Sequence, residues 1–369
     1  MRRLGAAVVG LGVGRAHAEA YASLPESSLV ALCDPDPARL QAANASYGVA
    51  AYADVADLLR DERVEVISVA TPHPSHAAIA IAAMESGRHV IVEKPMTVDL
   101  AEADRMVACA RRTGRTLGVI FQRRFWPASF RVKRAIAEGK LGAVVSAECE
   151  LTWWRTESYY RRDPWRGRWD TEGGGVLCNQ GIHALDLLQW VVGEVDTVWA
   201  RWANLSHPYI EVEDNAVAAV VFRSGALGVI RMSTSSRYSR TRVTVHGANG
   251  ASVSVIEEPE GAVGYNDLWT IPGEEQVREQ SLREHVDGGE YIYRAPVWEE
   301  PPTWYTGYRY RQAASPSYHA VQLQEFMQAI LEGREPLVNG EEGRKSLELM
   351  VALYRSGRTG AAVRLPLER

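Results

Sequence analysis

A lysine at the end of a short apolar run could transfer a proton or stabilise a negative charge. The run at residues 89–92 is typical of a buried parallel strand and ends in Glu93-Lys94-Pro95. In an open α/β sheet, ligands bind beyond the carboxyl ends of the strands, so the Lys94 ammonium would lie at the mouth of a site. Taken alone, Glu93 and Lys94 could also form an ordinary solvated ion pair. The other polar motifs of the chain favour the first interpretation.

A second group of polar side chains follows three glycines at residues 173–175. Asn179, His183 and Asp186 are spaced at i, i+4 and i+7, which would place them on one face of a helix. A lone histidine on a helix is usually a satisfied core residue, but a polar stripe centred on a histidine is harder to explain by packing. An asparagine can only form hydrogen bonds, so His183 is the candidate general base. Asn179 and Asp186 would orient the substrate or the histidine.

A glycine-rich turn near the N-terminus is typical of a dinucleotide phosphate site. Gly10, Gly12, Val13 and Gly14 lie between a short apolar run and a helical pattern, which is the context that such a motif needs. Glycines let the backbone approach a pyrophosphate, which the amides and dipole of the helix N-terminus then favour. The third glycine of the usual G-x-G-x-x-G spacing would fall at position 15, where this chain has Arg15.

An aspartate at the end of the next apolar run indicates which dinucleotide binds. Asp34 lies 24 residues after Gly10, close to where an acidic residue hydrogen-bonds the ribose 2′-hydroxyl of NAD. Pro35 follows it, and no arginine or lysine stands beside it to accommodate a 2′-phosphate. We therefore expect NAD rather than NADP.

The stretch Thr71-Pro72-His73-Pro74-Ser75-His76 follows another apolar run. Two histidines within four residues could bind a metal ion. However, no cysteine or acidic cluster lies beside them in the sequence. We interpret the stretch as a loop that lines the cofactor site, and we expect no metal.

Residues 153–169 are rich in aromatic and arginine side chains. Bases stack on aromatic rings between cationic groups in nucleic-acid sites, but the net charge of −5 argues against that function. Aromatic faces also stack on sugar rings and nicotinamide, and arginine binds carboxylates and phosphates in a fork. We expect Trp153 and Arg155 to contact substrate and Trp165 and Arg166 to contact cofactor. A purely structural loop is the alternative.

The elements around these motifs alternate between short apolar strands and helices in the N-terminal third. The expected strands cover residues 4–10, 29–33, 64–70, 89–92 and 116–121, and the expected helices cover residues 13–23, 37–47, 54–60, 75–86 and 100–112. This alternation predicts βαβ units and a parallel, doubly wound Rossmann sheet, hence the α/β class.

After residue 121 the pattern changes to strands at hairpin spacing. The expected helices cover residues 130–138, 317–332 and 341–356, and the expected strands cover residues 143–153, 195–204, 215–222, 226–233, 241–246 and 251–256. We expect a dinucleotide-binding domain at residues 1–121 and a substrate-binding and oligomerisation domain at residues 122–369. Residues 257–314 have no clear period and many aromatic side chains, so we interpret them as a functional insertion near the substrate pocket.

Length and composition exclude several classes of protein. A chain of 369 residues with 46% hydrophobic and 24% charged residues is typical of a two-domain soluble protein. No stretch approaches the roughly 20 apolar residues that span a bilayer, so we expect neither a membrane nor a nucleic acid as partner. Four widely spaced cysteines without a Cys-x-x-Cys pair indicate buried free thiols and a cytoplasmic protein.

Four motifs resemble the family of glucose–fructose oxidoreductase, inositol dehydrogenase and rhizopine-catabolism proteins (Gfo/Idh/MocA). They are the glycine-rich turn, Thr71-Pro72-x-x-x-His76, Glu93-Lys94-Pro95 and Phe121-Gln122-Arg123-Arg124-Phe125. The likeness covers almost the whole chain, although the family's helix histidine normally lies one residue further on than His17. It implies a Rossmann domain followed by an α+β domain with a large, open, mostly antiparallel sheet.

The resemblance also implies roles for individual residues. Family members normally have Asp-x-Gly-x-His-x-x-Asp around His183, whereas this chain has Asn179 at the first position, as some sugar dehydrogenases do. The open sheet face implies a homodimer or homotetramer, as in relatives. Arg124 is implied to contact substrate. The implied cofactor contacts are Thr71, Pro72, His76, Glu93, Lys94 and Gln122.

We expect an NAD-dependent oxidoreductase that moves a hydride between nicotinamide and a carbinol of a sugar-like, cyclitol or glycoside substrate. His183 would remove the hydroxyl proton as the hydride leaves, and Lys94 would stabilise the alkoxide charge and relay the proton. The two roles could be exchanged, because such groups titrate as a coupled pair. One alternative is a redox-neutral lyase, epimerase or glycosidase that keeps NAD bound. The other is a non-catalytic ligand sensor on the same fold, which would need neither Lys94 nor His183.

Overall fold

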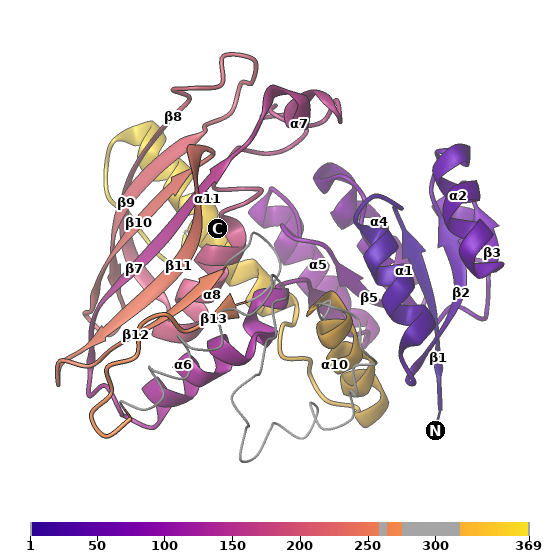
Figure 1. Cartoon of the computed structure of the whole chain (residues 1–369). Helices are drawn as coiled ribbons and strands as arrows, with labels where there is room; N and C mark the ends of the chain where they lie inside the picture. The colour runs from indigo at the N-terminus through magenta and orange to yellow at the C-terminus, as the bar shows by residue number, and fades with distance from the viewer. Residues whose placement is uncertain (1, 258–263, 275–317, 368–369) are drawn as a thin grey trace, which may run out of the picture. The chain divides into compact units, whose positions relative to one another are not determined.

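The chain forms two compact units in a computed structural model that describes residues 2–257, 264–274 and 318–367 (Figure 1). One unit combines Met1–Gln122 with Ser317–Leu347, and the other combines Arg123–Pro316 with Glu348–Arg369. Most of the aromatic insertion expected at 257–314 lies outside the described residues. No helix in the described part of the chain is long and apolar enough to cross a membrane. All four cysteines are buried free thiols, as the sequence predicts.

The first unit is built on a six-stranded parallel sheet in the order β3-β2-β1-β4-β5-β6. Its strands are β1 (Leu4–Val9), β2 (Ser27–Cys33), β3 (Ala50–Tyr52), β4 (Val66–Val69), β5 (His89–Val92) and β6 (Leu117–Val119). Its N-terminal helices are α1 (Gly14–Ser23), α2 (Pro37–Tyr47), α3 (Val55–Leu58), η1 (His73–Ser75), α4 (His76–Glu85) and α5 (Leu100–Thr113). This order is that of a doubly wound Rossmann sheet, whose ligand crevice lies where the strand order reverses, at β1 and β4. The predicted fold class is confirmed.

Capping residues explain where the helices of the first unit begin and end. The Asp99 side chain accepts the amide of Glu102 at 2.9 Å and caps α5, and Gly114 ends it in the left-handed conformation at φ 65°. Every residue of β1 is buried, as expected for a central parallel strand. Strand β3 is too short to leave a sequence signal and was not expected.

Helix α10 (Tyr318–Glu332) belongs to the first unit, although the sequence analysis assigned residues 317–347 to the second domain. The buried Gln322 side chain accepts the amide of Phe121 at 2.9 Å and donates to the carbonyl of Val119 at 2.7 Å. Helix α10 also packs on α1. An amphipathic helix does not reveal from its own sequence which apolar surface it covers, so this placement needed the structure. The domain boundary at residues 121 and 122 stays a prediction.

The second unit contains an eight-stranded, mostly antiparallel sheet in the order β13-β12-β11-β7-β10-β9-β8-β14. Its strands are β7 (Val144–Trp154), β8 (Val195–Ala203), β9 (Asn215–Phe222), β10 (Leu227–Ser233), β11 (Ser235–Gly247), β12 (Ser252–Glu257), β13 (Gly264–Tyr265) and β14 (Val363–Arg364). In the described part of this second sheet, only β7 and β10 pair in parallel. The open, mostly antiparallel sheet implied by the family resemblance is therefore confirmed.

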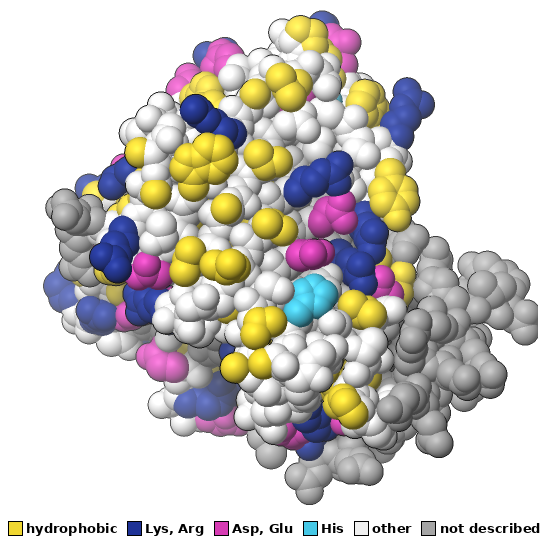
Figure 2. All heavy atoms as spheres, turned by 90° about the vertical axis from the view of Figure 1, so that its left-hand side faces the viewer, with side chains coloured by type: hydrophobic (Ala, Val, Ile, Leu, Met, Phe, Trp, Pro, Cys, Tyr) yellow, Lys and Arg dark blue, Asp and Glu magenta, His cyan; other side chains and the backbone are white. Residues whose placement is uncertain are grey.

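Helices cover one face of this sheet. They include α6 (Pro127–Ala137) and α8 (Ile182–Val192), which pack on β7, β11, β12 and β13. Element η2 (Gln122–Phe125) precedes α6, α7 (Glu157–Arg161) follows β7, and α11 (Gly340–Thr359) precedes β14. The opposite face of β8, β9 and β10 carries exposed apolar side chains such as Trp199, Val217 and Leu227. Figure 2 shows apolar side chains gathered over this face, with charged side chains around and between them.

Helix α8 begins later than the sequence analysis expected. Its first residue is Ile182, so Asn179 lies in the turns that precede the helix and not on the helical face of His183 and Asp186. The expectation of three polar residues on one helical face is therefore wrong for Asn179. The glycine run and the hydrogen bonds of buried carboxylates, described below, hold residues 175–181 as turns.

Candidate active site

The glycine-rich turn between β1 and α1 fits a backbone-bound anion. Gly10 has a φ of +89°, and a Cβ there would lie 2.5 Å from the carbonyl oxygen of Ala70, so only glycine is tolerated. A Cβ on Gly12 would meet nothing within 4 Å. Among the described residues, no side chain caps α1, so the positive end of its dipole is available to an anionic ligand. These residues fit the pyrophosphate of a dinucleotide.

Asp34 is buried beside this turn and fixes its shape. Its carboxylate accepts the amide of Leu11 at 2.7 Å through Oδ2 and the amide of Asp36 at 2.9 Å through Oδ1. Each carboxylate oxygen can accept more than one hydrogen bond. Asp34 therefore retains acceptor capacity for a ribose hydroxyl while it holds the turn.

Lys94 follows β5, and the buried side chain of Glu93 holds its backbone. Glu93 Oε2 accepts the Lys94 amide at 3.1 Å, and Oε1 lies 3.0 Å from His17 Nε2 and 3.5 Å from His319 Nε2. Burial alone would raise the pKa of Glu93, but the hydrogen bonds and charges of His17 and His319 outweigh it and hold that pKa well below its usual value. The ionised, buried carboxylate of Glu93 thus holds the backbone of Lys94.

The same three side chains offer a possible set of metal ligands. The ligand atoms of His17, Glu93 and His319 lie within 4.8 Å of one another. The His17 ring is oriented by Ser68, whose hydroxyl lies 3.1 Å from Nδ1 and 2.7 Å from the Tyr21 hydroxyl. Because hydrogen bonds already join the histidines to the carboxylate, we interpret the group as a hydrogen-bonded network behind Lys94.

His76 links the loops that follow β4 and β5. It is fully buried, with Nδ1 2.9 Å from the carbonyl oxygen of Pro95 and Nε2 2.7 Å from that of Thr71. His76 thus positions the Thr71-Pro72 step and the Lys94-Pro95 turn relative to each other. Direct contact of these residues with the cofactor stays a prediction.

Gln122 provides an acceptor that a ligand could use. Its Oε1 atom is buried and has no hydrogen-bond partner among the described residues. Buried polar atoms are nearly always paired in proteins. An amide or hydroxyl donor of a bound cofactor would satisfy this oxygen, which agrees with the cofactor contact implied for Gln122.

In the second unit, Asn179 is held by a carboxylate that the sequence analysis did not include. Asn179 Nδ2 donates to Glu172 Oε1 and, at 3.4 Å, to the Tyr159 hydroxyl. Glu172 is 1% exposed, and its Oε2 accepts the amide of Gly167 at 2.5 Å. Arg166 Nη1 lies 3.9 Å from Glu172 and donates to the Tyr159 hydroxyl at 2.6 Å. The buried carboxyl group of Glu172 therefore orients the side-chain amide of Asn179.

A second buried carboxyl group, Glu213, fixes the backbone of the same turn. It accepts the amides of Gly175 at 2.9 Å and Leu177 at 3.0 Å, and the hydroxyl of Tyr354 at 2.8 Å. A Cβ on Gly175 would lie 1.8 Å from the Glu213 carbonyl oxygen, which explains why glycine is required there. Burial outweighs these neutral donors and raises the pKa of Glu213 to about 7.

His183 lies in the first turn of α8 and is 7% exposed. One turn further along, Asp186 forms a buried two-point ion pair with Arg124, at 2.8 Å to Nε and 2.7 Å to Nη2. This pair ties η2 to α8 and so fixes the helix that carries His183. The interpretation of Arg124 and Asp186 as substrate contacts stays a prediction, because their charged groups already engage each other.

The aromatic and arginine side chains expected to bind ligands stack on one another. The Arg155 guanidinium lies 4.7 Å from the Trp153 ring and 4.8 Å from the Tyr159 ring, and Arg166 lies 4.5 Å from Tyr159 and 4.4 Å from Trp165. Cation–π contacts of this kind keep arginines extended over aromatic faces. The structure thus brings Arg166 and Tyr159 together with Asn179. The contacts with substrate and cofactor stay predictions.

Sequence reasoning missed four residues of these networks: Glu172, Glu213, His319 and Tyr354. Glu172 directly precedes the three glycines, and that position was a usable signal. The other three lie far along the chain from the residues they contact and carry no motif. Only the folded chain brings them to the turns that bear Lys94 and Asn179.

Comparisons with known proteins agree with this architecture. Residues 4–121 match the oxidoreductase family with an NAD-binding Rossmann fold, and residues 130–253 match the Gfo/Idh/MocA C-terminal domain. D-apiose dehydrogenase of Paraburkholderia graminis is 28% identical over 99% of this chain and 90% of its own length. Myo-inositol 2-dehydrogenase of Thermotoga maritima is 28% identical over 97% of both chains.

Solved structures give the same result. The WlbA dehydrogenase from Bordetella pertussis, in complex with NADH and UDP-GlcNAcA, is 30% identical and aligns over 100% of both chains with a TM-score of 0.82. The levoglucosan dehydrogenase complex with NADH aligns over 100% of both chains with a TM-score of 0.78 at 21% identity, which shows the shared fold. The chain therefore belongs to the Gfo/Idh/MocA oxidoreductase family, and its cofactor is NAD.

Proposed function

We propose that this NAD-dependent oxidoreductase acts on a carbinol of a sugar-like or cyclitol substrate. Relatives named as D-apiose and myo-inositol dehydrogenases support this substrate class. The observation that carries the proposal is that buried charged groups hold the segments that bear two residues able to transfer a proton, Lys94 and His183. Lys94 follows a glutamate held in a buried network, and His183 begins a helix fixed by a buried ion pair.

In this mechanism, Lys94 and His183 act on the same substrate hydroxyl. Neutral His183 takes the hydroxyl proton as the carbon–hydrogen bond breaks, and the Lys94 ammonium stabilises the developing alkoxide. Asn179 orients the substrate by a hydrogen bond. Bound NAD supplies the acceptor for the hydride. The glycine-rich turn and Asp34 hold that cofactor, so its binding does not depend on Lys94.

A substrate panel tests the proposal. Purified protein is incubated with NAD and individual aldoses, uronates and cyclitols, and NADH is followed by absorbance. We expect Lys94→Ala and His183→Ala each to lower kcat by at least about a hundredfold on the best substrate, while NAD affinity measured by titration is retained. The double variant should lose far less than the product of the two losses, because groups that act as a unit are not additive.

Two results would contradict this function. Folded single variants with near-normal kcat would remove both residues from the mechanism and favour a ligand sensor. Substrate conversion without net NADH, by a protein that purifies with bound NAD, would favour a redox-neutral lyase, epimerase or glycosidase.

The buried free thiols support a cytoplasmic location, which we propose with the activity.

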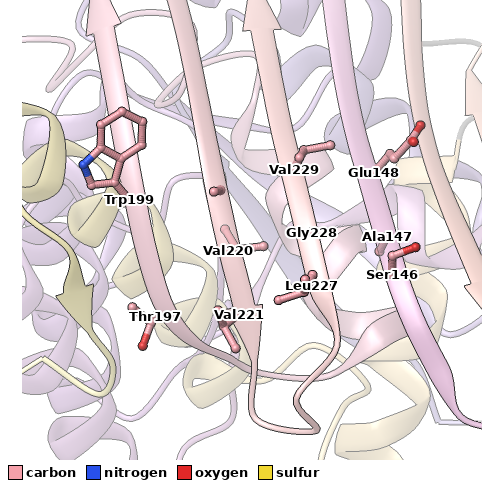
Figure 3. A pocket seen from close by; sticks show the side chains of 11 residues that line it. Ser146, Ala147, Glu148, Thr197, Trp199, Val220, Val221, Leu227, Gly228 and Val229 are labelled. Atoms are coloured by element: carbon pink, nitrogen blue, oxygen red, sulfur yellow. The ribbon is translucent and has the colours of Figure 1, made fainter.

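We also propose that the open face of the second unit's sheet joins two copies of the chain. A hollow of about 400 Å³ on this face is lined by residues from β7, β8, β9 and β10, including Glu148, Trp199 and Val229 (Figure 3). Leu227 is 60% exposed and Val229 is 53% exposed. Contiguous exposed apolar surface of this kind marks an interaction site, and a two-fold contact would bury the same patch on both copies.

Light scattering after size exclusion tests this assembly. We expect a wild-type dimer or tetramer, and we expect Leu227→Glu to shift it to smaller species because a charge would be buried in the contact. Leu205→Glu is the control, since Leu205 is 75% exposed but lies outside the strands. A monomeric wild-type protein would rule the assembly out.

A further inference from the structure

Glu213 binds three successive backbone amides of the turn that precedes α8. Its carboxyl oxygens accept the amide of Gly175 at 2.9 Å and that of Leu177 at 3.0 Å, and its backbone carbonyl accepts the amide of Val176 at 3.1 Å. Successive amides that converge in this way form a concave site that suits an anion. Because a carboxyl group of the same chain fills this site, the conformation of residues 175–177 depends on Glu213.

The hydrogen bonds of this turn continue into α8. The carbonyl of Val176 accepts the amide of Gly181 at 2.6 Å, and the carbonyl of Gly181 accepts the amide of Leu185, in the first turn of α8, at 3.0 Å. A Cβ on Gly181 would lie 2.3 Å from the sulfur atom of Met232, so the turn is closely packed. The position of His183, between Gly181 and Leu185, therefore follows that of residues 175–177.

The Tyr354 hydroxyl can pair with Glu213 in either of its protonation states. It donates to Glu213 Oε1 at 2.8 Å when the carboxyl group is ionised, and it can accept from the O–H of the neutral carboxyl group. Both side chains are buried, Glu213 at 1% and Tyr354 at 5% exposure. A proton can therefore join or leave Glu213 while this contact is kept.

The charged groups around Glu213 do not fix its protonation. Within the described residues, Glu213 forms no ion pair. The pKa of Tyr354 is raised first by burial and then by the charges of Glu213, Cys178 and Glu172, so its hydroxyl keeps its proton. The carboxylate of the adjacent Asp214 accepts two amides of the preceding loop instead. Because burial raises the pKa of Glu213 to about 7, both of its forms exist at neutral pH.

We propose that Glu213 is a positioning residue for His183, and that its ionised form holds the turn before α8 more firmly than its protonated form. The inference rests on the proposed function and deepens it, because it makes the placement of the general base depend on pH. Hydrogen bonds to an ionised acceptor are roughly twice as strong as neutral ones. Burying the charge lowers the stability of the fold, so a rise in pH should lower stability and raise activity. A purely structural role would lower both together.

The ratio of kcat between wild type and Glu213→Gln tests the inference. The glutamine side chain has only one oxygen, so the variant leaves the amide of Gly175 or of Leu177 without a side-chain acceptor. In the ratio, every ionisation that the two proteins share cancels, including that of His183. On the best panel substrate we expect a ratio of about ten at pH 8 and of about two at pH 6. NAD affinity, measured by titration, should be the same in both proteins.

Tyr354→Phe should move the same transition. Without the hydroxyl, the carboxylate loses a donor and the pKa of Glu213 rises further, so the increase of kcat over that of Glu213→Gln should come about one pH unit higher than in wild type. Glu211→Gln and Tyr238→Phe are the matched controls, because both residues are exposed in the same unit. Both control variants should follow the wild-type profile.

Hydrogen exchange followed by mass spectrometry separates a local effect from a general loss of structure. At pH 8, peptides that cover residues 175–185 should exchange faster in Glu213→Gln than in wild type, whereas peptides from β10 and α6 should not. A kcat ratio that does not change with pH, or a normal kcat in Glu213→Gln, would overturn the inference. If the proposed function fails, wild type forms no NADH with any panel compound. Exchange then decides whether Glu213 holds the turn, and equal exchange of residues 175–185 in the two proteins refutes it.

Discussion

Glu93 in the first unit and Glu213 in the second are both buried carboxyl groups that hold a turn, but their pKa values move in opposite directions. Burial acts to raise the pKa of each. At Glu93 the hydrogen bonds and charges of His17 and His319 outweigh burial, and the pKa lies well below its usual value. At Glu213 the partners are two backbone amides and the Tyr354 hydroxyl, and the pKa is raised to about 7.

The difference shows that two imidazole rings stabilise a buried carboxylate more than two amides and a hydroxyl do. The hydrogen bonds and charges of His17 and His319 lower the pKa of Glu93, although burial lowers the pKa of the His17 ring itself, so the hydrogen bond from His17 matters more than a charge on that ring. Amides and a hydroxyl offer only dipoles to Glu213. The turn before Lys94 is therefore held by an anion at neutral pH. The turn that carries Asn179 is held by a group that changes its protonation near pH 7.

Removing the charge at Glu93 should have the largest effect. Glu93→Gln keeps the shape of the side chain but leaves His17 and His319 without an anion. Breaking one partner of a buried charged network typically costs about 3–5 kcal/mol of unfolding free energy, and we expect a loss of that order. Activity should fall at least about tenfold, because the backbone amide of Lys94 loses a charged acceptor.

The sign of the pH dependence sharpens this prediction. A carboxylate whose folded pKa is depressed stabilises the fold above its unfolded pKa, and this stabilisation is lost as the pH falls. The loss of unfolding free energy in Glu93→Gln, relative to wild type, should therefore be largest above about pH 5 and become smaller in acid. Urea unfolding followed by circular dichroism at several pH values measures it. Glu62→Gln, an exposed control in the same unit, should stay within about 0.5 kcal/mol of wild type.

The contribution of Glu213 to the unfolding free energy should depend on pH in the opposite direction to that of Glu93. A carboxyl group whose folded pKa is raised stabilises the fold below its unfolded pKa, and the stabilisation is lost as the pH rises through the folded pKa. As the pH rises from 4.5 to about 7, the unfolding free energy of wild type should fall by about 3 kcal/mol relative to that of Glu213→Gln, whose side chain cannot ionise. The difference in unfolding free energy between the two proteins, measured across this range, tests the prediction. A constant difference would mean that Glu213 is ionised throughout.

The sequence predicted the parts of the fold that local patterns encode. A few residues are enough to predict a strand that is buried on both faces, such as β1. The same holds for a capped helix such as α5, which has Asp99 before it and Gly114 after it. The glycine-rich turn and Glu93-Lys94-Pro95 could be assigned to strand ends for the same reason. The short strands β3, β13 and β14 could not be found, because two or three residues have no measurable period.

The networks behind the candidate site could not be predicted, because they join residues far apart in the chain. His319 reaches Glu93 across 226 positions, and Tyr354 reaches Glu213 across 141. Neither residue belongs to a motif. Asn179 was placed on a helix from its spacing alone, but the hydrogen bonds that Glu213 accepts from Gly175 and Leu177 keep that segment in turns. Tertiary contacts overrode the local pattern there.

A third buried carboxylate, Asp34, gives the smallest predicted effect and shows what such a group does when it faces a ligand. Like Glu213, Asp34 accepts two backbone amides, those of Leu11 and Asp36. If Asp34 also binds the ribose diol, its carboxylate repels the 2′-phosphate of NADP, and Asp34→Ala removes that charge. The preference for NAD over NADP in kcat/KM should then fall by at least about tenfold, or roughly 1.4 kcal/mol.

The control for Asp34 separates cofactor recognition from loosening of the turn. Asp36 caps α2 by accepting the amides of Ala38 and Arg39, so Asp36→Ala should lower stability by about 1 kcal/mol without changing the cofactor preference. Steady-state kinetics with both cofactors gives the preference, and thermal unfolding gives the stability. If Asp34→Ala loses stability but keeps the preference of wild type, Asp34 only shapes the turn, and the ribose contact must be assigned to another residue.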